Sequence, residues 1–421
     1  MDCVLKNGTA YIGGKFVKCD VIISQGKVFL SNGKVSSSGV IYDCQNKFIF
    51  PGFVDVHVHL REPGFSYKET IRSGTEAAAK SGYGAVFSMP NLNPVPDSVE
   101  NLKVQQDLID RDAVINVYPM AAISVGEKGE ELSDMENLAQ NVLAFSDDGR
   151  GVQKDDMMKT AMQIAKKHDR VIAAHCEVNE LLNGGYIHDG EYAKAHGHKG
   201  ICSASEYKQI ERDLKLVKET GVKYHVCHVS AKESVDLIRK AKAEGIDVTA
   251  ETGPHYLVLD DSMLKESGDY KMNPPIRAKD DRLALIEGIK DGTLEMIATD
   301  HAPHSLEEKS KGLLSINGIV GLETAFPIIY TKLVKEGIIT LEKTIELMSI
   351  NPAKRFSLDY EIKDGAEANL AVFDLDTEYE IKPEEFLSKG KSTPFGGWKV
   401  YGKCLMNVNG GKIVYQDKNF R

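Results

Sequence analysis

The sequence predicts an α/β protein: a (β/α)8 barrel of the TIM type that carries a small β-sandwich built from both chain ends. Beyond Pro51, apolar runs of strand length alternate eight times with longer amphipathic segments, which is typical of parallel strands joined by helices. Both chain ends instead hold short β-rich runs between glycine-bearing turns. A length of 421 residues suits a barrel with such additions.

The β-rich ends are expected to form one small domain, although the barrel separates them in sequence. The N-terminal part covers residues 1–51, with apolar runs at 21–23, 27–30 and 48–50. The C-terminal part covers residues 356–421, with runs at 370–373, 398–401 and 412–415. Residues 52–355 are assigned to the barrel.

Eight apolar runs account for the barrel strands. They are residues 53–60, 85–89, 114–118, 142–145, 171–175, 223–228, 247–250 and 294–299. Helices are expected between them, among others at residues 68–80, 203–220, 231–243 and 280–289, where Ser203 offers a cap with Glu206 three residues on. Eight repeats favour a closed barrel over an open sheet.

Composition excludes several classes of protein. The net charge is −10 and no Lys/Arg cluster occurs, which argues against a nucleic-acid partner. No apolar stretch reaches the roughly 18 residues of a membrane helix, and the first residues do not resemble a signal peptide. The seven cysteines include no CxxC pair, so reduced thiols in a cytoplasmic protein are expected.

Ligand-type side chains follow several predicted strands, at the end where a barrel carries its active site. Strand residues two apart share a face, so Asp55, His57 and His59 lie on one side of the first strand. Other strands end in Asp147-Asp148, His175, His228 and Asp300. A single histidine at a strand end does not indicate a metal site, but five of the eight strands end in a ligand-type residue. Imidazole and carboxylate together suit Zn²⁺ or a similar divalent cation.

The remaining histidines are expected to be structural. His301 points away from Asp300 on a strand, which favours core packing, and His225 faces away from His228. His188, His196 and His198 fall in residues 183–200, which are expected to be a solvated loop.

Several motifs resemble those of the dihydroorotase family, within the amidohydrolase superfamily. The opening motif is PGFVDVHVHLREPG at residues 51–64, and a later one is TDHAPH at residues 299–304. Further blocks are SMPN at 88–91, KMNPP at 271–275 and PFGGW at 394–398. The resemblance spans nearly the whole chain. It implies reversible, zinc-dependent hydrolysis of (S)-dihydroorotate to N-carbamoyl-L-aspartate in pyrimidine (UMP) biosynthesis.

The resemblance implies two Zn²⁺ ions per subunit. His57, His59 and Asp300 match the ligands of one ion, and His175 and His228 match those of the other. Asp148 matches the bridging carboxylate of the subgroup that bridges with aspartate, and residues 141–150 contain no lysine, the alternative bridge. Asp147 remains the alternative to Asp148, because the sequence does not fix which neighbour turns inward.

The resemblance also implies a substrate site and a proton carrier. Arg61, Asn91 and His304 match residues that bind the substrate carboxylate, a task that suits the planar fork of arginine. Asn273 matches a residue that touches the ring. Asp300 is the expected catalytic residue, which takes a proton from the attacking water and passes it to the leaving ring nitrogen.

Two departures from the family pattern leave the metal ligands untouched. Pro254-His255-Tyr256 stands where the family usually has Pro-His-His, so any role of the second histidine is lost. Ile316-Asn317-Gly318 stands where it often has Pro-Phe-Gly, and Asn317 and Gly318 are assigned to the substrate contact of that segment. Residues 305–317 are polar and contain glycine, so we expect a mobile lid there rather than packed structure.

Two rival functions are weighed against this one. Hydantoinases and allantoinases act on rings without the carboxylate that Arg61 and Asn91 would bind. A non-catalytic scaffold subunit for aspartate transcarbamoylase would be expected to have lost metal ligands, whereas all six positions are occupied. A homodimer is the expected assembly, and association with aspartate transcarbamoylase stays open. No nucleic-acid or membrane partner is expected.

Overall fold

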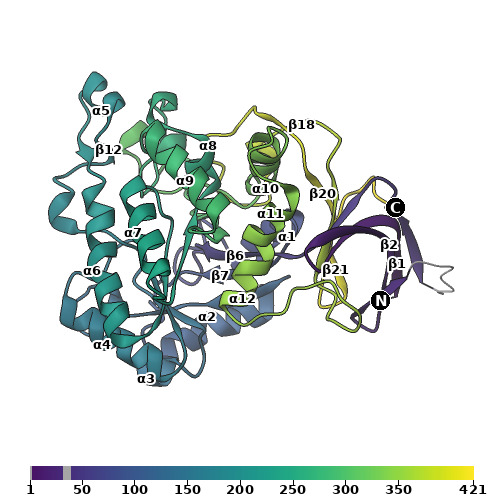
Figure 1. The fold of residues 1–421 in the computed structure, drawn as a ribbon, viewed down its shortest axis with the longest axis horizontal. Helices are drawn as coiled ribbons and strands as arrows, with labels where there is room; N and C mark the ends of the chain where they lie inside the picture. The colour runs from purple at the N-terminus through teal and green to yellow at the C-terminus, as the bar shows by residue number, and fades with distance from the viewer. Residues whose placement is uncertain (1, 32–38) are drawn as a thin grey trace.

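The computed structural model describes residues 2–31 and 39–421. Figure 1 shows two parts: parallel strands surrounded by helices, and a β-sheet at one end of the molecule that holds both chain termini. This is the mixed α/β architecture that the sequence predicts.

Each of the eight apolar runs contributes to a strand. The strands are β6 (Phe53–Val58), β7 (Tyr83–Ser88), β8 (Asn116–Pro119), β9 (Ala121–Ala122), β10 (Ala144–Ser146), β11 (Val171–Ala174), β14 (Lys223–Val226), β15 (Val248–Thr252) and β16 (Met296–Ile297). They pair in parallel as β6-β7-β8 and as β9-β10-β11-β14-β15-β16. Beyond β16, His59 N–H donates to the His301 carbonyl at 2.8 Å, and Val58 and His301 form a parallel bridge.

Helices follow most of these strands. They are α1 (Ile71–Lys80), α2 (Val99–Asp112), α3 (Met135–Leu138), α4 (Asp155–Lys167), α5 (Glu191–His196), α6 (Ala204–Thr220), α7 (Lys232–Ala243), α8 (Pro254–Val258), α9 (Lys279–Asp291), α10 (Ala325–Ile329), α11 (Leu341–Ile345) and α12 (Asn351–Arg355). Single turns of other helix types are η1 (Val125–Glu127), η2 (Asn179–Leu181), η3 (Asp261–Met263), η4 (Gly268–Tyr270), η5 (Gly312–Leu314), η6 (Tyr330–Val334), η7 (Glu346–Ile350) and η8 (Pro383–Glu385).

The expected cap of α6 is wrong in detail. The Ser203 side chain makes no capping bond. Glu206 is buried and accepts instead from the backbone N–H groups of Ser230 and Ala231, which precede α7. A carboxylate at a helix N-terminus satisfies free N–H donors, so Glu206 serves the neighbouring helix rather than its own.

Both chain ends enter one sheet with the strand order β21-β20-β17-β5-β1-β2-β3, and β4 pairs with β1. Its members are β1 (Cys3–Ile12), β2 (Lys15–Ser24), β3 (Lys27–Ser31), β4 (Val40–Asp43), β5 (Phe48–Pro51), β17 (Leu370–Asp374), β20 (Lys403–Asn409) and β21 (Lys412–Gln416). β17 therefore lies between an N-terminal and a C-terminal strand. The run at 398–401 does not join this sheet, because β19 (Lys399–Val400) pairs with β18 (Tyr379–Glu380).

The end sheet is attached to the parallel strands through shared core and backbone bonds. Phe50 of β5 and Phe373 of β17 stack at 4.9 Å and contact Phe53 and Phe326. Asn407 Nδ2 donates to the carbonyls of Ala79 and Tyr83 at 2.9 and 2.8 Å. These contacts fix the sheet against α1 and the start of β7.

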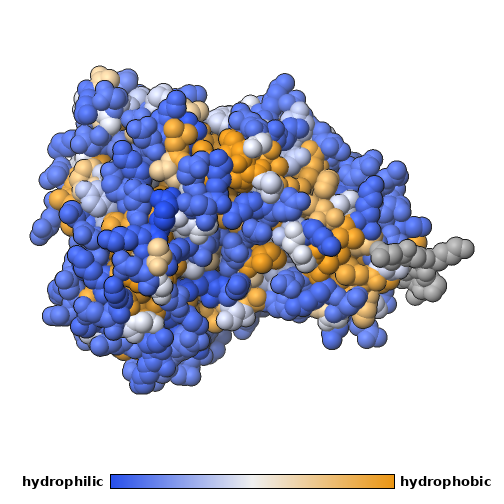
Figure 2. All heavy atoms as spheres, in the orientation of Figure 1, coloured by the Kyte–Doolittle hydropathy of each residue, from blue (hydrophilic) through white to orange (hydrophobic). Residues whose placement is uncertain are grey.

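The surface and the thiols agree with the composition. Figure 2 shows hydrophilic side chains over most of one face, with apolar ones gathered near the middle of the view. Within residues 2–31 and 39–421, no helix is long and apolar enough to cross a bilayer. All seven cysteines lie in these residues, and none forms a disulfide there.

Candidate metal centre and substrate pocket

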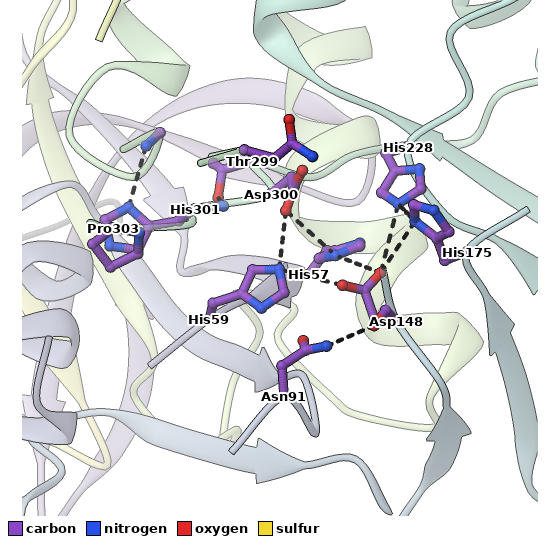
Figure 3. A network of polar contacts seen from close by, with 12 residues as sticks. His57, His59, Asn91, Asp148, His175, His228, Thr299, Asp300, His301 and Pro303 are labelled. Carbon is purple, nitrogen blue, oxygen red and sulfur yellow. Dashed lines mark hydrogen bonds and ion pairs between the residues drawn. The ribbon is translucent and has the colours of Figure 1, made fainter. Parts of the chain in front are cut away.

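β6 delivers two histidines to one point. His57 and His59 lie two residues apart, so both side chains leave the same face of the strand. Their Nε2 atoms lie 3.5 and 3.1 Å from Oδ1 of Asp300, which follows β16. Figure 3 shows the two rings turned towards this carboxylate.

Asp148 occupies the centre of the cluster. It follows β10, and its Oδ1 lies 3.4 Å from His57 Nε2 while its Oδ2 lies 3.4 Å from His59 Nε2. Asp147 turns the other way, where it accepts hydrogen bonds from the N–H groups of Ile123 and Ser124 and from the Ser124 hydroxyl. The structure therefore brings Asp148, and not its neighbour, among the histidines.

His175 and His228 face Asp148 from the opposite side, at the ends of β11 and β14 (Figure 3). His175 Nδ1 lies 2.9 Å from His228 Nε2, and these atoms lie 3.7 and 3.5 Å from Asp148 Oδ1. The aspartate thus stands between a group of three side chains and a group of two.

The donor atoms fit divalent cations. Ligands around a tetrahedral ion with bonds of about 2.0–2.1 Å lie roughly 3.3 Å from one another. His57, His59 and Asp300 form one converging group, and His57, Asp148 and His228 form another. Two of the buried ligand atoms, His57 Nε2 and Asp148 Oδ1, have no hydrogen-bond partner among the residues that the structure describes. Buried polar atoms of this kind are expected to bind something, and a cation fits the donor set.

Charge within the cluster opposes the effect of burial. Burial disfavours the charged form of His57, but Asp148, Glu251 and Asp300 outweigh it and raise the pKa of His57 well above its usual range. Burial also favours neutral Asp148, yet His57 and hydrogen bonds from His228 and His57 hold its pKa well below the usual range. The cluster therefore favours ionised carboxylates, which cation binding needs.

Two buried carboxylates hold the ligands in place. Glu251 of β15 accepts from His57 Nδ1 at 2.7 Å and from the His228 N–H at 3.1 Å, and it contacts His225 Nε2 at 3.1 Å. Glu251 thereby holds the Nδ1 side of the His57 ring, so that Nε2 faces the centre. Asp55 accepts from the Thr299 N–H and hydroxyl, next to Asp300. Sequence reasoning missed Glu251, whose only signal is an acidic residue in the seventh strand.

A cavity of about 240 Å³ opens beside the cluster. It is lined by His59, Arg61, Asn91, Asp148, Gly149, His175, Asn273, Asp300, Ala302, His304, Ile316, Asn317 and Gly318. All six residues matched to substrate contacts lie in this lining. Gly149, Ala302 and Ile316 were not predicted.

Cationic side chains lie around His304 in the wall of the cavity. Lys68 Nζ lies 3.3 Å from His304 Nδ1, and Arg61 Nη2 lies 3.2 Å from His304 Nε2. His304 Nε2 also lies 2.8 Å from the Asn317 carbonyl oxygen, and Nδ1 lies 3.4 Å from Glu308 Oε2. Burial, Arg61 and Lys68 together lower the pKa of His304 to about 3, so the ring is neutral. Arg61 Nε donates to the Pro303 carbonyl at 3.3 Å, and the remaining N–H groups of the guanidinium are the donors that it can offer to an anion.

The two asparagines of the cavity are oriented by buried glutamates. Asn91 Nδ2 donates to the Asp148 carbonyl at 2.6 Å and to Glu127 at 3.2 Å (Figure 3 shows the first bond). Asn273 Nδ2 donates to Glu177 at 2.9 Å. Their Oδ1 atoms are buried and have no hydrogen-bond partner within residues 2–31 and 39–421. Glu127 and Glu177 carry no sequence signal, because their partners come from distant segments.

The loop at residues 305–317 is packed more closely than expected. Leu313 and Ser315 are buried, and Glu308 accepts from Tyr67 and pairs with Lys68 at 2.9 Å. His301 is buried, as expected, and contacts Glu69 at 3.4 Å. His188 is also buried, within β12 (Ile187–His188), so residues 183–200 are not a plain solvated loop.

Known proteins identify the family. A sequence model described as dihydro-orotase-like matches residues 46–234. A dihydroorotase of Fusobacterium nucleatum is 49% identical over 420 residues, covering 99% of both chains. A dihydroorotase of Bacillus cereus is 47% identical over 426 residues, covering 100% of this chain and 99% of the relative. This chain belongs to the dihydroorotase family.

Solved structures place the dihydroorotase-family chain among cyclic amide hydrolases. L-hydantoinase (dihydropyrimidinase) from Arthrobacter aurescens matches with a TM-score of 0.90 and 25% identity, covering 100% of this chain and 97% of that one. Dihydropyrimidinase from Brevibacillus agri matches with a TM-score of 0.86 and 23% identity, covering 100% of this chain and 96% of that one. The expected family and class of enzyme are confirmed, and the hydantoinases share its fold at much lower identity.

Proposed function

We propose that this chain is a metal-dependent dihydroorotase that interconverts (S)-dihydroorotate and N-carbamoyl-L-aspartate in pyrimidine biosynthesis. The observation that carries the proposal is the polarity of one cavity. Asp148, Asp300, Arg61 and His304 all line it, and Lys68 contacts His304 from outside the lining. A cyclic amide that bears a carboxylate matches both kinds of charge, whereas a ring without a carboxylate gives the Arg61 guanidinium no anion to pair with.

We propose two Zn²⁺ ions for the cluster. His57, His59 and Asp300 would hold one, His175 and His228 the other, and Asp148 would bridge them. The distances of 2.9–3.7 Å between donor atoms and the buried His57 Nε2 and Asp148 Oδ1, which have no hydrogen-bond partner among the described residues, support this set. When bound, divalent cations lower the pKa of a water towards neutrality and polarise an amide carbonyl.

The residues of the chain supply the proton transfer and the orientation. During hydrolysis, the Asp300 carboxylate takes the proton of the attacking water and gives it to the ring nitrogen as the C–N bond breaks. In ring closure the same carboxylate removes the proton of the ureido nitrogen. Asp55 holds the adjacent Thr299 backbone, so Asp300 stays in place for both directions.

Arg61 fixes the other end of the ring. It is expected to bind the substrate carboxylate through two parallel N–H donors, together with Asn91 and His304. Asn273, Asn317 and Gly318 would contact the ring. Arg61 is half-buried, and burial lowers the pKa of its guanidinium to about 10, so pairing with an anion recovers part of its desolvation cost.

We also propose finer details of the fold and of the assembly. We infer that the three-stranded and six-stranded sheets are one closed (β/α)8 barrel at residues 52–355, because the bridge between Val58 and His301 joins their outer edges. Residues 1–51 and 356–421 are proposed as the sandwich. A homodimer in the cytoplasm is the proposed state, and association with aspartate transcarbamoylase remains an option that co-purification tests.

A metal count combined with two substrates tests the function. We expect about two zinc ions per chain and turnover of dihydroorotate, with far slower turnover of hydantoin. Turnover of hydantoin alone would make the chain a hydantoinase. Two bound ions without turnover of either ring would contradict the proposal.

A further inference from the structure

Lys309 lies in the loop beside the cavity, yet its side chain points into the protein. Lys309 has 7% of its surface exposed, and its Nζ donates to the carbonyls of Lys271, Ile316 and Gly318 at 2.9, 2.8 and 2.7 Å. An ammonium has three N–H donors, so all of them are used. Lys309 therefore has no donor left for a ligand, and its action on the cavity must be indirect.

The three carbonyls belong to two walls of the cavity. Ile316 and Gly318 flank Asn317, and Lys271 precedes the wall residue Asn273 by two positions. The Gly318 N–H donates to the Lys271 carbonyl at 3.0 Å, so the two segments also contact each other directly. One ammonium thus ties both walls together.

The wall at 316–318 needs such an anchor. These residues belong to no helix or strand, and this chain lacks the proline that would restrict the backbone there. Gly318 has a φ of +132°, and a Cβ at this position would lie 2.6 Å from the Ala302 carbonyl. The segment is therefore held by tertiary bonds rather than by its own conformational preference.

Burial of the Lys309 ammonium costs free energy, which argues that this side chain has a role in the structure. Burial, together with the nearby charge of Lys271, lowers the pKa of Lys309 to about 7. A lysine on a surface loop would ordinarily keep its ammonium in water. Here three charge-assisted hydrogen bonds replace that water.

We propose that Lys309 is a positioning residue that fixes the wall formed by Ile316, Asn317 and Gly318 against the Asn273 segment, and so sets affinity for the substrate. This inference rests on the proposed function. Lys309 touches no reacting atom in this scheme. Its loss is expected to weaken ground-state and transition-state binding alike, which raises KM more than it lowers kcat.

The test compares Lys309→Met, which keeps a long unbranched side chain, one atom shorter, but has no donor, with Lys311→Met at an exposed lysine of the same loop. For Lys309→Met we expect KM for dihydroorotate to rise at least tenfold, kcat to fall less than threefold, and metal content to stay at the parental value. Lys311→Met should keep both constants within twofold. A fall in kcat alone, with KM unchanged, would indicate lost folded enzyme and overturn the inference.

Hydrogen exchange of the protein without substrate gives a second readout that does not depend on the reaction. Backbone amides of residues 312–319 should exchange faster in Lys309→Met than in the parent or in Lys311→Met, with the strands unchanged. Equal exchange would overturn the positioning role. Absence of dihydroorotate turnover in the parent would instead refute the proposed function, and the exchange result would still decide whether Lys309 holds the wall. If Lys309→Met does not fold, Lys309→Gln takes its place in both measurements.

Discussion

The two adjacent aspartates that follow β10 point their side chains in opposite directions. Asp148 faces four histidines, whereas Asp147 accepts three hydrogen bonds from Ile123 and Ser124. Sequence reasoning placed both at the right strand end but could not separate them, because the chain leaves β10 in a turn and strand alternation no longer applies. The hydrogen bonds of Asp147 to Ile123 and Ser124, which are distant in sequence, decide which aspartate faces the histidines.

Asp148→Asn should lose metal far more readily than Asp147→Asn. A neutral amide cannot offset the repulsion between the two proposed cations, so we expect at least one of them to be lost on dialysis. Asp147→Asn should keep both ions and lose about 1–2 kcal/mol of unfolding free energy through its weakened bonds to Ser124. Metal analysis and urea unfolding of both variants check this. The reverse order of metal loss would move the bridge to Asp147.

Glu251→Gln tests how the ligands are held. The amide cannot accept from His57, His225 and the His228 backbone as a carboxylate does, so the His57 ring loses the partner that holds its Nδ1 side. We expect zinc affinity to fall about 10–100-fold, measured by competition with a chelator. Glu244→Gln, at an exposed position, is the matched control. Unchanged affinity in Glu251→Gln would show that the ligands are positioned without it.

At the scale of elements, long periodic segments were predictable and short ones were not. The eight strands follow from apolar runs, and α1, α6, α7 and α9 lie where amphipathic spacing places them. Residues 183–200 lack such a pattern, yet they contain β12 and α5, because their partners lie elsewhere in the chain. Sequence reasoning missed Glu127, Glu177 and Glu251 for the same reason. Their roles depend on side chains that no local spacing reveals.

His188 in β12 makes this segment sensitive to acid. Burial, aided by the charge of Arg277, lowers the pKa of His188 to about 4 from its usual 6.5. The folded protein thus resists protonation that the unfolded chain accepts, so stability present above pH 6.5 is lost as pH falls towards 4. The loss can reach roughly 3 kcal/mol at about 1.4 kcal/mol per pKa unit.

The His188→Asn variant isolates this contribution. Other groups titrate alike in both proteins, so the difference in unfolding free energy between parent and variant should shrink between pH 7 and pH 4.5. Urea unfolding at both pH values measures it. A difference that widens in acid would show that His188 binds its proton readily in the fold.

At the scale of the whole molecule, one core spans both parts of the chain. Phe50 and Phe373 of the end sheet pack on Phe53 and Phe326 from the parallel-strand part. The sequence indicated that the two ends come together, since both are β-rich. It did not indicate the strand order, because pairing of β5 with β17 depends on contacts across the whole chain.

Unfolding should therefore be a single event. Trp398 is the sole tryptophan, and Lys332 Nζ of η6 lies 5.7 Å from the centre of its ring, so its fluorescence reports on the packing of the C-terminal segment against η6. We expect the denaturation curves from tryptophan fluorescence and from far-UV circular dichroism to share one midpoint. Two separate midpoints would mean that the C-terminal segment around Trp398 unfolds independently of the bulk of the helices and strands.

The pairing of β5 with β17 also has a consequence for synthesis. Roughly 320 residues separate these strands, so one edge of β5 has no partner while the ribosome makes the intervening chain. At about 5–20 residues per second this takes on the order of 15 to 65 seconds. An unpaired apolar strand edge is a site for aggregation, so the nascent chain is most vulnerable at its first finished strands. Translation speed, rather than sequence alone, then sets how much of this enzyme reaches its native state.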